Sequence, residues 1–306
     1  MKHILVAGLI NMETTVRIDG FPLTYFPVRY PFHGVKSSVS GVGYNVASAL
    51  TRLGTKVNFL SLIGKDAIGE IVGGTLDKAG ISDECVLRLL SETPQSVILY
   101  DAEGKRQIHV DLKDIQEATY PEESFKKALQ GVSLAALCNI NFTRPFLKPV
   151  RRRGVMIATD VHAISSLDDA YNLDYLNAAD ILFASDEALG RSPEDWAAEV
   201  LARFPAKIVV VGLGKKGALL ATRPSGNMER NMERLPAVST RPVINTIGAG
   251  DALFSAFLHS FSAGLPPREA LQRAIVFASW KIGETGAAAG FLSEAELIDL
   301  EHRTHD

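Results

Sequence analysis

The strongest chemical signal in the sequence is a short glycine-containing turn near residue 250. Residues 248–251 read Gly-Ala-Gly-Asp, and apolar residues with helical spacing follow over 252–263. A glycine-rich turn that opens a helix leaves main-chain N–H groups free beside the positive end of the helix dipole, which predicts an anion site. Asp251 could be a base that faces a phosphoryl group, or it could simply stabilise the first turn. Spacing alone leaves both interpretations open.

Apolar strands that alternate with helices must position this turn. The strands are expected at 4–9, 56–63, 134–140, 155–159, 181–184 and 208–211, and the helices at 43–53, 67–79, 145–153, 167–176 and 193–204. Such alternation predicts an α/β fold whose mostly parallel sheet is covered by helices on both faces.

Four further stretches do not follow this alternation of strands and helices. Residues 14–18, 35–39, 96–100 and 106–112 have the composition of strands with no helix between them, and 101–104 reads as a hairpin turn. These stretches predict a small antiparallel sheet inserted into the body. The sheet could cover a cleft, or it could consist of edge strands without a function.

Composition excludes several classes of protein. The 306 residues include 32 Lys and Arg against 35 Asp and Glu, a net charge of −3, which gives no basic surface for nucleic acid. No apolar run reaches about 18 residues, so we expect no membrane span. Cys85 and Cys138 form neither a disulfide framework nor a metal motif, which predicts a reduced, cytoplasmic protein.

Five segments, in order along the chain, resemble one known family. Thr246 with Gly-Ala-Gly-Asp at 248–251 resembles the D-T-x-G-A-G-D signature of the ribokinase (PfkB) carbohydrate kinases. The other matches are 11–13 for N-x-D, 40–54 for G-G-x-G-x-N-x-A…L-G, 62–69 for V-G-x-D-x-x-G and 211–217 for T-L-G-x-x-G. Together the matches cover nearly the whole chain.

The resemblance implies a fold and an activity. It implies one ribokinase-like domain over residues 1–306, a three-layer α/β sandwich with a mostly parallel central sheet and a small β-sheet lid from segments near 12–40 and 95–114. It also implies ATP-dependent phosphorylation of a hydroxymethyl group on a sugar or nucleoside, with Mg²⁺. A homodimer through the lid is one further option.

The resemblance also implies residue roles. Asp251 is expected to be the catalytic base, with Gly248, Ala249 and Gly250 as the anion hole. The residues expected at the substrate are Asn11, Glu13, Gly41, Gly43 and Asn45, and those expected at the nucleotide are Ser185, Gly214, Gly217 and Ser279. An amide that donates and accepts suits sugar hydroxyls. A carboxylate kept ionised by a helix N-terminus can still accept a proton late in phosphoryl transfer.

Two departures from the family pattern concern ions. Asn245 replaces the first carboxylate of the signature, near which K⁺-responsive members hold the ion, so we expect weak or absent K⁺ activation. Glu187 lies one position early relative to N-x-x-E, which in the family is tied to Mg²⁺ through water. The sequence therefore assigns no metal ligand.

Aromatic residues near residues 40–54, which resemble the sugar-binding segment of the family (the sugar segment), concern the substrate. They are Tyr44 and, in the lid region, Tyr25, Phe26, Tyr30 and Phe32. A nucleobase offers a face for stacking, so these residues favour a nucleoside or another substituted ribosyl substrate. The same aromatics could instead fill the core or form a contact between two lids.

Two other functions stay open. A kinase-fold protein with altered ion motifs could bind a sugar or nucleoside as a regulator, although Asp251 and its turn are retained. Gly41-Val42-Gly43 could suggest a dinucleotide-dependent oxidoreductase, but it lacks the third glycine of that motif. The histidines show no metal-ligand spacing and are expected to be ordinary structural or solvent-facing imidazoles; they include His3, His33, His109, His162 and His259.

Overall fold

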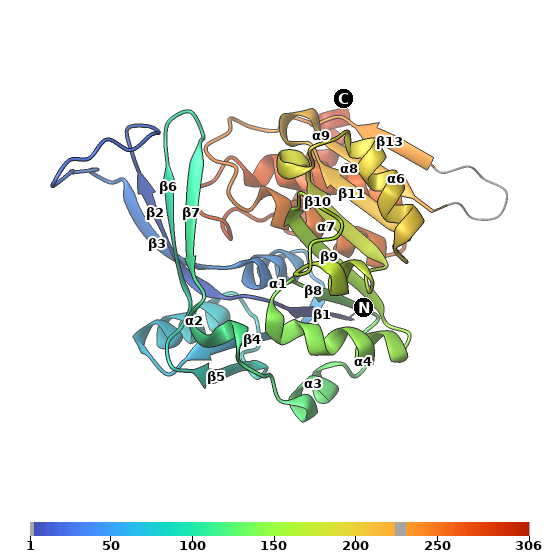
Figure 1. Cartoon of the computed structure of the whole chain (residues 1–306). Helices are drawn as coiled ribbons and strands as arrows, with labels where there is room; N and C mark the ends of the chain where they lie inside the picture. Colours follow the sequence, from blue (N-terminus) through green and yellow to red (C-terminus); the bar gives the residue numbers. More distant parts are fainter. Residues whose placement is uncertain (1–2, 224–230, 306) are drawn as a thin grey trace.

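A large sheet with helices on both faces forms the body of the computed structural model, which describes residues 3–223 and 231–305 (Figure 1). Its strands are β1 His3–Ala7, β4 Lys56–Gly64, β5 Val86–Leu90, β8 Leu134–Leu137, β9 Met156–Ala163, β10 Ile181–Ser185, β11 Ile208–Gly212, β12 Ala218–Thr222 and β13 Asn231–Leu235. Across the described residues they lie in the order β13-β12-β11-β10-β9-β8-β1-β4-β5. All neighbours from β11 to β5 pair in parallel, and β12 is antiparallel to both of its neighbours. The prediction of a mostly parallel sheet is confirmed.

Successive residues of the strands face two different helical layers. In β1, Ile4 and Val6 belong to one buried cluster, and Leu5 and Ala7 belong to another. The first layer holds α1 Val42–Arg52, α2 Ala67–Lys78, α7 Ala249–Ser262, α8 Pro267–Lys281 and α9 Glu294–His305. The second holds α3 Glu122–Ala128, α4 Leu147–Arg152, α5 Leu173–Leu176 and α6 Pro193–Arg203. The expected three-layer sandwich is therefore confirmed.

A second, smaller sheet stands beside the body as a lid (Figure 1). It comprises β2 Asn11–Arg17, β3 Val35–Ser40, β6 Gln95–Tyr100 and β7 Arg106–Asp111, in the order β3-β2-β6-β7. The outer pairs are antiparallel, but β2 and β6 pair in parallel. The expected small antiparallel sheet is confirmed in the pairs β3–β2 and β6–β7, and the two pairs join through β2 and β6, which run in the same direction.

The local structure corrects two expectations on helices and adds a strand. Of the helix expected over 167–176, only Leu173–Leu176 forms, because Asp169 Oδ1 accepts from the main-chain N–H of Tyr171 at 3.2 Å. The helix expected from 145 begins earlier, as the 3₁₀ turn η2 Asn141–Phe146. Strand β5 was not predicted. The remaining 3₁₀ turns are η1 Lys113–Gln116, η3 Asp186–Ala188 and η4 Gly214–Lys216.

The helices of the described ranges do not have the features of a membrane span. None of these helices combines the length and the apolar character that crossing a bilayer requires.

Candidate active site

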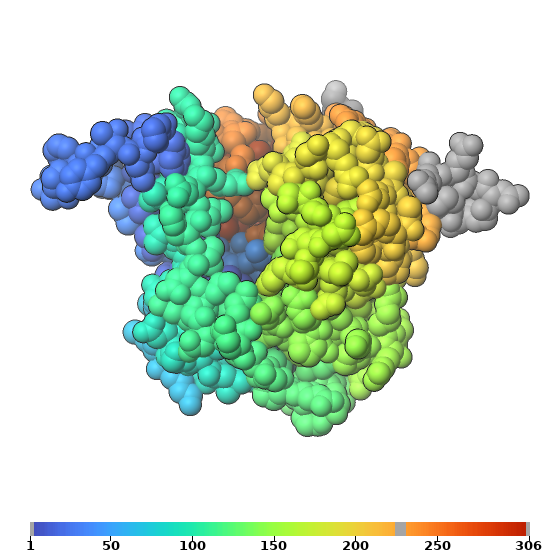
Figure 2. Space-filling view, in the orientation of Figure 1, coloured from blue at the N-terminus to red at the C-terminus, as the bar shows by residue number. Residues whose placement is uncertain are grey.

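The carboxyl ends of five neighbouring parallel strands meet along one edge of the sheet. They belong to β11, β10, β9, β8 and β1. Ligands of open α/β sheets bind outside this edge. The chain enters the lid directly after β1, so the lid stands over the same edge, and Figure 2 shows the surface hollowed between the lid strands and the body.

Helix α7 begins with the predicted anion-binding turn. Gly248 has φ 75°, and a Cβ there would lie 2.5 Å from Ala287 O, so only glycine fits. The main-chain N–H of Ala249 donates to Thr246 O at 3.2 Å, so this predicted member of the anion hole has its donor occupied within the turn. The N–H of Ala252 donates to Gly248 O at 3.0 Å, whereas those of Gly250 and Asp251 have no acceptor in the described part of the chain. Free donors at the start of a 14-residue helix provide the geometry of an anion site.

A chain of hydrogen bonds links the predicted sugar segment to Asp251. Ser40 Oγ donates to Glu13 Oε2 at 3.1 Å and lies 3.4 Å from Asn45 Oδ1. Asn45 Nδ2 then donates to Asp251 Oδ2 at 2.7 Å. The four side chains come from β2, β3, α1 and α7, so the fold brings together residues that are far apart in the sequence.

Two buried acceptors in this cluster have no donor. Asn11 Nδ2 donates to Ser96 Oγ in the lid at 2.9 Å, but Asn11 Oδ1 and Glu13 Oε1 have no hydrogen-bond partner among the described residues. The two side chains are 3% and 7% exposed. An unsatisfied buried polar atom costs about 1–3 kcal/mol. These oxygens therefore favour a ligand that brings hydroxyl donors.

The electrostatics of the site favour Asp251 as a base. Burial raises the pKa of Asp251 above the ordinary value, and the carboxylate of Asp160 raises it further, while Asn45, His162 and Lys281 act in the opposite direction. Burial likewise raises the pKa of Glu13. Asp251 is thus a stronger proton acceptor than a solvent-exposed aspartate.

Gly41 and Gly43 position α1 against the connection between β1 and β2. Gly41 O accepts from Asn45 N at 2.8 Å at the start of α1. A Cβ at Gly43 would lie 2.5 Å from the carbonyl carbon of Gly8. The two glycines therefore let α1 approach closely enough to place Asn45. Their direct contact with substrate stays a prediction.

The structure adds two residues to the site that the sequence analysis did not assign to it. Asp160 Oδ1 accepts from His162 N at 2.8 Å, and Asp160 Oδ2 lies 3.6 Å from His162 Nδ1. Both side chains act electrostatically on Asp251. The signal that could have found them is their position at the end of the apolar run 155–159, since parallel strands end at the active edge.

Arg106 connects the lid to the body. From β7 it donates to Thr246 Oγ1 at 2.9 Å and to Glu187 Oε1 at 3.4 Å. Thr246 precedes the anion turn, and Glu187 lies in η3 after β10. The lid therefore contacts both loops through one guanidinium. The sequence analysis did not find Arg106, because no local pattern marks a contact across 140 residues.

The residues predicted at the nucleotide lie in three places. Ser185 ends β10, where its Oγ accepts from Glu187 N at 3.3 Å, and after β11 Gly214 begins η4 and Gly217 follows it. Ser279, in α8, is buried, and its Oγ accepts from Thr240 N at 3.1 Å. The Ser279 hydroxyl thus already holds the segment before α7. The nucleotide roles of these four residues stay predictions.

Tyr44 corrects an expectation about the substrate. The side chain is 5% exposed and belongs to the core cluster of the first helical layer. Its ring packs in the core, which was the second interpretation of the sequence. It therefore offers no face for stacking on a nucleobase. The lid residues Tyr25 and Phe32 are instead 87% and 86% exposed.

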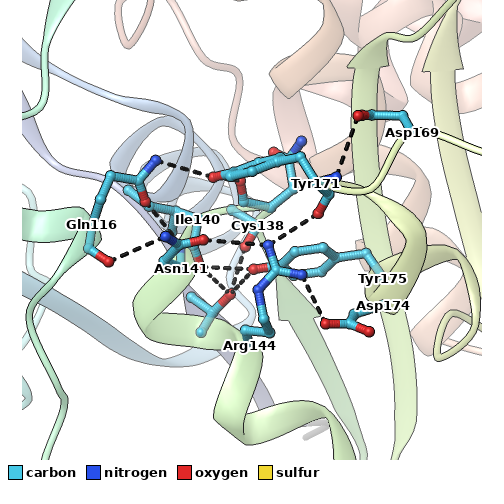
Figure 3. A network of polar contacts seen from close by, with 11 residues as sticks. Gln116, Cys138, Ile140, Asn141, Arg144, Asp169, Tyr171, Asp174 and Tyr175 are labelled. Carbon is cyan, nitrogen blue, oxygen red and sulfur yellow. Dashed lines mark hydrogen bonds and ion pairs between the residues drawn. The ribbon is translucent and has the colours of Figure 1, made fainter.

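A polar network braces the loop after β8, beside the catalytic edge (Figure 3). Arg144 donates to Asp174 Oδ2 at 2.9 Å and to Tyr171 O at 3.0 Å, and its guanidinium lies 5.0 Å from the ring centre of Tyr175. Tyr171 Oη donates to Asn139 O at 2.9 Å. The network therefore fixes Asn139 at the edge of the site.

Comparisons with known proteins identify the family of the chain. The model of the pfkB family of carbohydrate kinases matches residues 1–294. The ATP-dependent ribose-1-phosphate kinase of Halopiger xanaduensis is 28% identical over 99% of both chains, and the 2-dehydro-3-deoxygluconokinase of Bacillus subtilis is 26% identical over 86% of both. The solved structure of a microbiome-derived acarbose kinase superposes with a TM-score of 0.86 at 26% identity, covering 99% of both chains. The chain belongs to the pfkB family of carbohydrate kinases and is an ATP-dependent sugar kinase.

Proposed function

We propose that the enzyme phosphorylates a hydroxymethyl group of a sugar, with Asp251 as the base that takes the proton of the attacking hydroxyl. The observation that carries this proposal is the 2.7 Å hydrogen bond from Asn45 to Asp251, which joins the sugar segment to the first turn of α7. A substrate that satisfies Asn11 and Glu13 would lie beside the base and beside the free N–H groups.

The chemistry follows from this arrangement. The hydroxyl oxygen forms a bond to the γ-phosphorus of ATP, the bond from that phosphorus to the β,γ-bridging oxygen breaks, and ADP leaves. The hydroxyl proton passes to a carboxylate oxygen of Asp251, whose raised pKa suits it to accept that proton late. The N–H groups of Gly250 and Asp251 hold the anionic phosphoryl oxygens in place.

The proposal includes Mg²⁺, which neutralises phosphate charge when it is bound. No group of three His, Cys, Asp or Glu side chains able to hold a metal occurs in residues 3–223 and 231–305. Mg²⁺ binds largely through phosphates and water, with one or two carboxylates. We propose Glu187, in η3 after β10, as the carboxylate that would hold the Mg²⁺ of Mg-ATP. Chelation by EDTA is expected to abolish turnover, and excess Mg²⁺ to restore it.

The substrate class follows from the donor and acceptor pattern. Asn11 Oδ1 and Glu13 Oε1 call for hydroxyl donors, whereas the burial of Tyr44 removes the main reason to favour a nucleoside. The Halopiger relative is named for ribose 1-phosphate. We therefore propose a free or phosphorylated sugar as the substrate, ahead of nucleosides.

A panel of substrates tests the function. ADP release is measured with pentoses, hexoses, their phosphates, 2-keto-3-deoxy sugar acids and nucleosides, and the site of phosphorylation is read by ³¹P and ¹³C NMR. We expect one sugar to exceed the others in kcat/KM and to carry the new phosphate on a hydroxymethyl group. Sugar binding without ADP release would favour a regulator instead. Phosphorylation confined to nucleosides would contradict the proposed substrate class.

We also propose that two copies meet through the lid loop between β2 and β3. This loop exposes several large apolar side chains, namely Leu23, Tyr25, Phe26, Val28, Tyr30 and Phe32. Exposed apolar patches of this kind mark interaction sites. Sedimentation equilibrium should show a dimer that the Tyr25→Ser, Phe32→Ser double variant converts to a monomer. A wild-type monomer at micromolar concentration would contradict this part of the proposal.

The cysteines are consistent with a reducing compartment, and we propose the cytoplasm. Cys138 is buried, Cys85 is half-buried, and both are free. Burial raises the pKa of each thiol, which keeps them protonated and unreactive. Cell fractionation with antibodies checks this location.

A further inference from the structure

Lys281 is a fully buried charged residue that the mechanism above does not use. It ends α8, and its side chain is 0% exposed. A buried ammonium is costly unless its donors are satisfied, so lysines in this environment are rare. Its burial beside the anion turn therefore needs a physical reason.

The contacts of the ammonium are main-chain carbonyls from two loops. Nζ donates to Ile247 O at 2.5 Å and to Gly286 O at 2.8 Å. Ile247 directly precedes the anion turn, and Gly286 lies in the loop that follows α8. Lys281 forms no ion pair with a carboxylate of the described residues. Such coordination by carbonyl dipoles is how proteins hold a bare monovalent cation.

The same two loops contact each other beside the ammonium. The main-chain N–H of Asn245 donates to Ile282 O at 3.2 Å, and Gly248 lies so close to Ala287 that a Cβ would meet its carbonyl oxygen. Lys281 therefore fixes the position of the anion turn relative to the loop after α8. Loss of the ammonium would leave two carbonyl oxygens facing a cavity.

The ammonium can also strengthen a donor of the turn. Ile247 C=O and Gly248 N–H belong to one peptide unit, so a cation on the oxygen polarises the N–H at the other end. That N–H lies in the anion turn. Lys281 thus acts on the phosphate through the main chain, without contacting substrate, which makes it a positioning residue.

The charged groups around Lys281 oppose each other. Burial lowers its pKa to about 8. Asp251, Glu13 and Glu284 raise the pKa, and Arg241 lowers it further. Near neutral pH the side chain is charged. The two carboxylates of the active site favour that charge, although neither touches Nζ.

We propose that the Lys281 ammonium is an internal monovalent cation: through Ile247 O and Gly286 O it holds the phosphate-binding turn in place, so that the enzyme needs no K⁺. The inference rests on the proposed function, because it assigns the turn to phosphate. It also gives a second physical cause for the weak or absent K⁺ activation that is expected from Asn245. A cation from solution has no place to bind while the ammonium is there.

The test is rescue of truncated variants by small cations. Lys281→Ala empties the space beside the carbonyls, whereas Lys281→Met fills it without charge. With Mg-ATP and the best sugar of the panel, we expect kcat to fall about 10- to 100-fold in both variants, with little change in sugar KM. KCl or NH₄Cl should restore Lys281→Ala at least fivefold, LiCl should not, and Lys281→Met should not respond. Wild type and Lys78→Ala, which removes an exposed lysine at the end of α2, should give flat titrations.

Thermal melting provides a readout that does not depend on turnover. The melting temperature of Lys281→Ala should rise with KCl but not with LiCl at equal ionic strength, and that of wild type should respond to neither. Wild-type activity in Lys281→Met, or equal responses of Lys281→Ala to K⁺ and Li⁺, would overturn the inference while the kinase assignment stands. If no sugar is phosphorylated, the proposed function fails, and melting alone still decides the role of Lys281. If Lys281→Ala does not fold, the kcat of Lys281→Met decides it.

Discussion

Asn45 Nδ2 donates to Asp251 Oδ2 at 2.7 Å, across 206 residues of sequence. Asn45 lies in the first turn of α1 and Asp251 in the first turn of α7, and the two helices pack side by side on one face of the sheet. The start of α1 belongs to the sugar segment, and the start of α7 belongs to the anion turn. This single bond therefore aligns substrate, base and phosphate site.

The first prediction concerns the pH dependence of turnover. The hydrogen bond from Asn45 lowers the pKa of Asp251 against the effect of burial. Asn45→Ala removes it, so the pKa should rise, and the acidic limb of the kcat profile should move to higher pH. Activity should be lost at higher pH than in wild type as pH falls, because the base must be deprotonated. An unmoved limb would show that this bond does not tune Asp251.

The second prediction concerns stability. Because burial raises the pKa of Asp251, the folded state binds a proton in a range where the unfolded state has lost it, and stability falls as pH rises through that range. At pH 8 the carboxylate therefore destabilises the fold. Asp251→Asn should raise the melting temperature by about 2–4 °C at pH 8, and the difference should shrink towards pH 4. Exposed Asp77→Asn is the control. A lower melting temperature for Asp251→Asn at pH 8 would contradict the assignment.

The third prediction concerns the lid. Arg106 joins Thr246 and Glu187 across the gap between lid and body. Arg106→Gln should raise the KM for ATP and lower kcat about tenfold, since a charge-assisted contact contributes about 1.5–3 kcal/mol. Lys105→Gln, at the neighbouring exposed turn position, should change neither constant. Equal kinetics for the two variants would exclude a role for this contact.

The fourth prediction concerns Tyr44. Because its ring packs in the core, Tyr44→Phe should leave the sugar KM within about twofold, and Tyr44→Ala should cost about 3–5 kcal/mol of unfolding free energy. Urea denaturation and steady-state kinetics measure the two effects. A large rise in the sugar KM of Tyr44→Phe would show instead that the Tyr44 side chain contacts the substrate.

Sequence patterns predicted those parts of the site that are local in the chain. The Gly-Ala-Gly-Asp turn opens a helix at Gly248, and Asn45 follows a glycine-containing helix start, so propensity and motif agree with the fold. The alternation of apolar runs predicted the parallel sheet for the same reason.

The remaining parts depend on contacts that no local pattern contains. The sequence shows Lys281 only as a charged residue at the end of a helix. Its ammonium is buried because α8 packs against the anion turn, and no local pattern contains that contact. Arg106 reaches the body from a hairpin whose pairing with β2 sets its place. The sequence places Tyr44 beside Asn45 but does not give the direction of its side chain, so stacking on the substrate and packing in the core both stayed open.

The central claim is that Asp251 accepts the proton, and Asp251→Asn tests it most directly. The amide keeps the size and the hydrogen bonding of the side chain but removes the base. With the best sugar of the panel, kcat should fall about 10²–10⁴-fold, while the sugar dissociation constant from calorimetry stays within about threefold of wild type. A folded Asp251→Asn enzyme that retains more than a tenth of wild-type kcat would contradict the account.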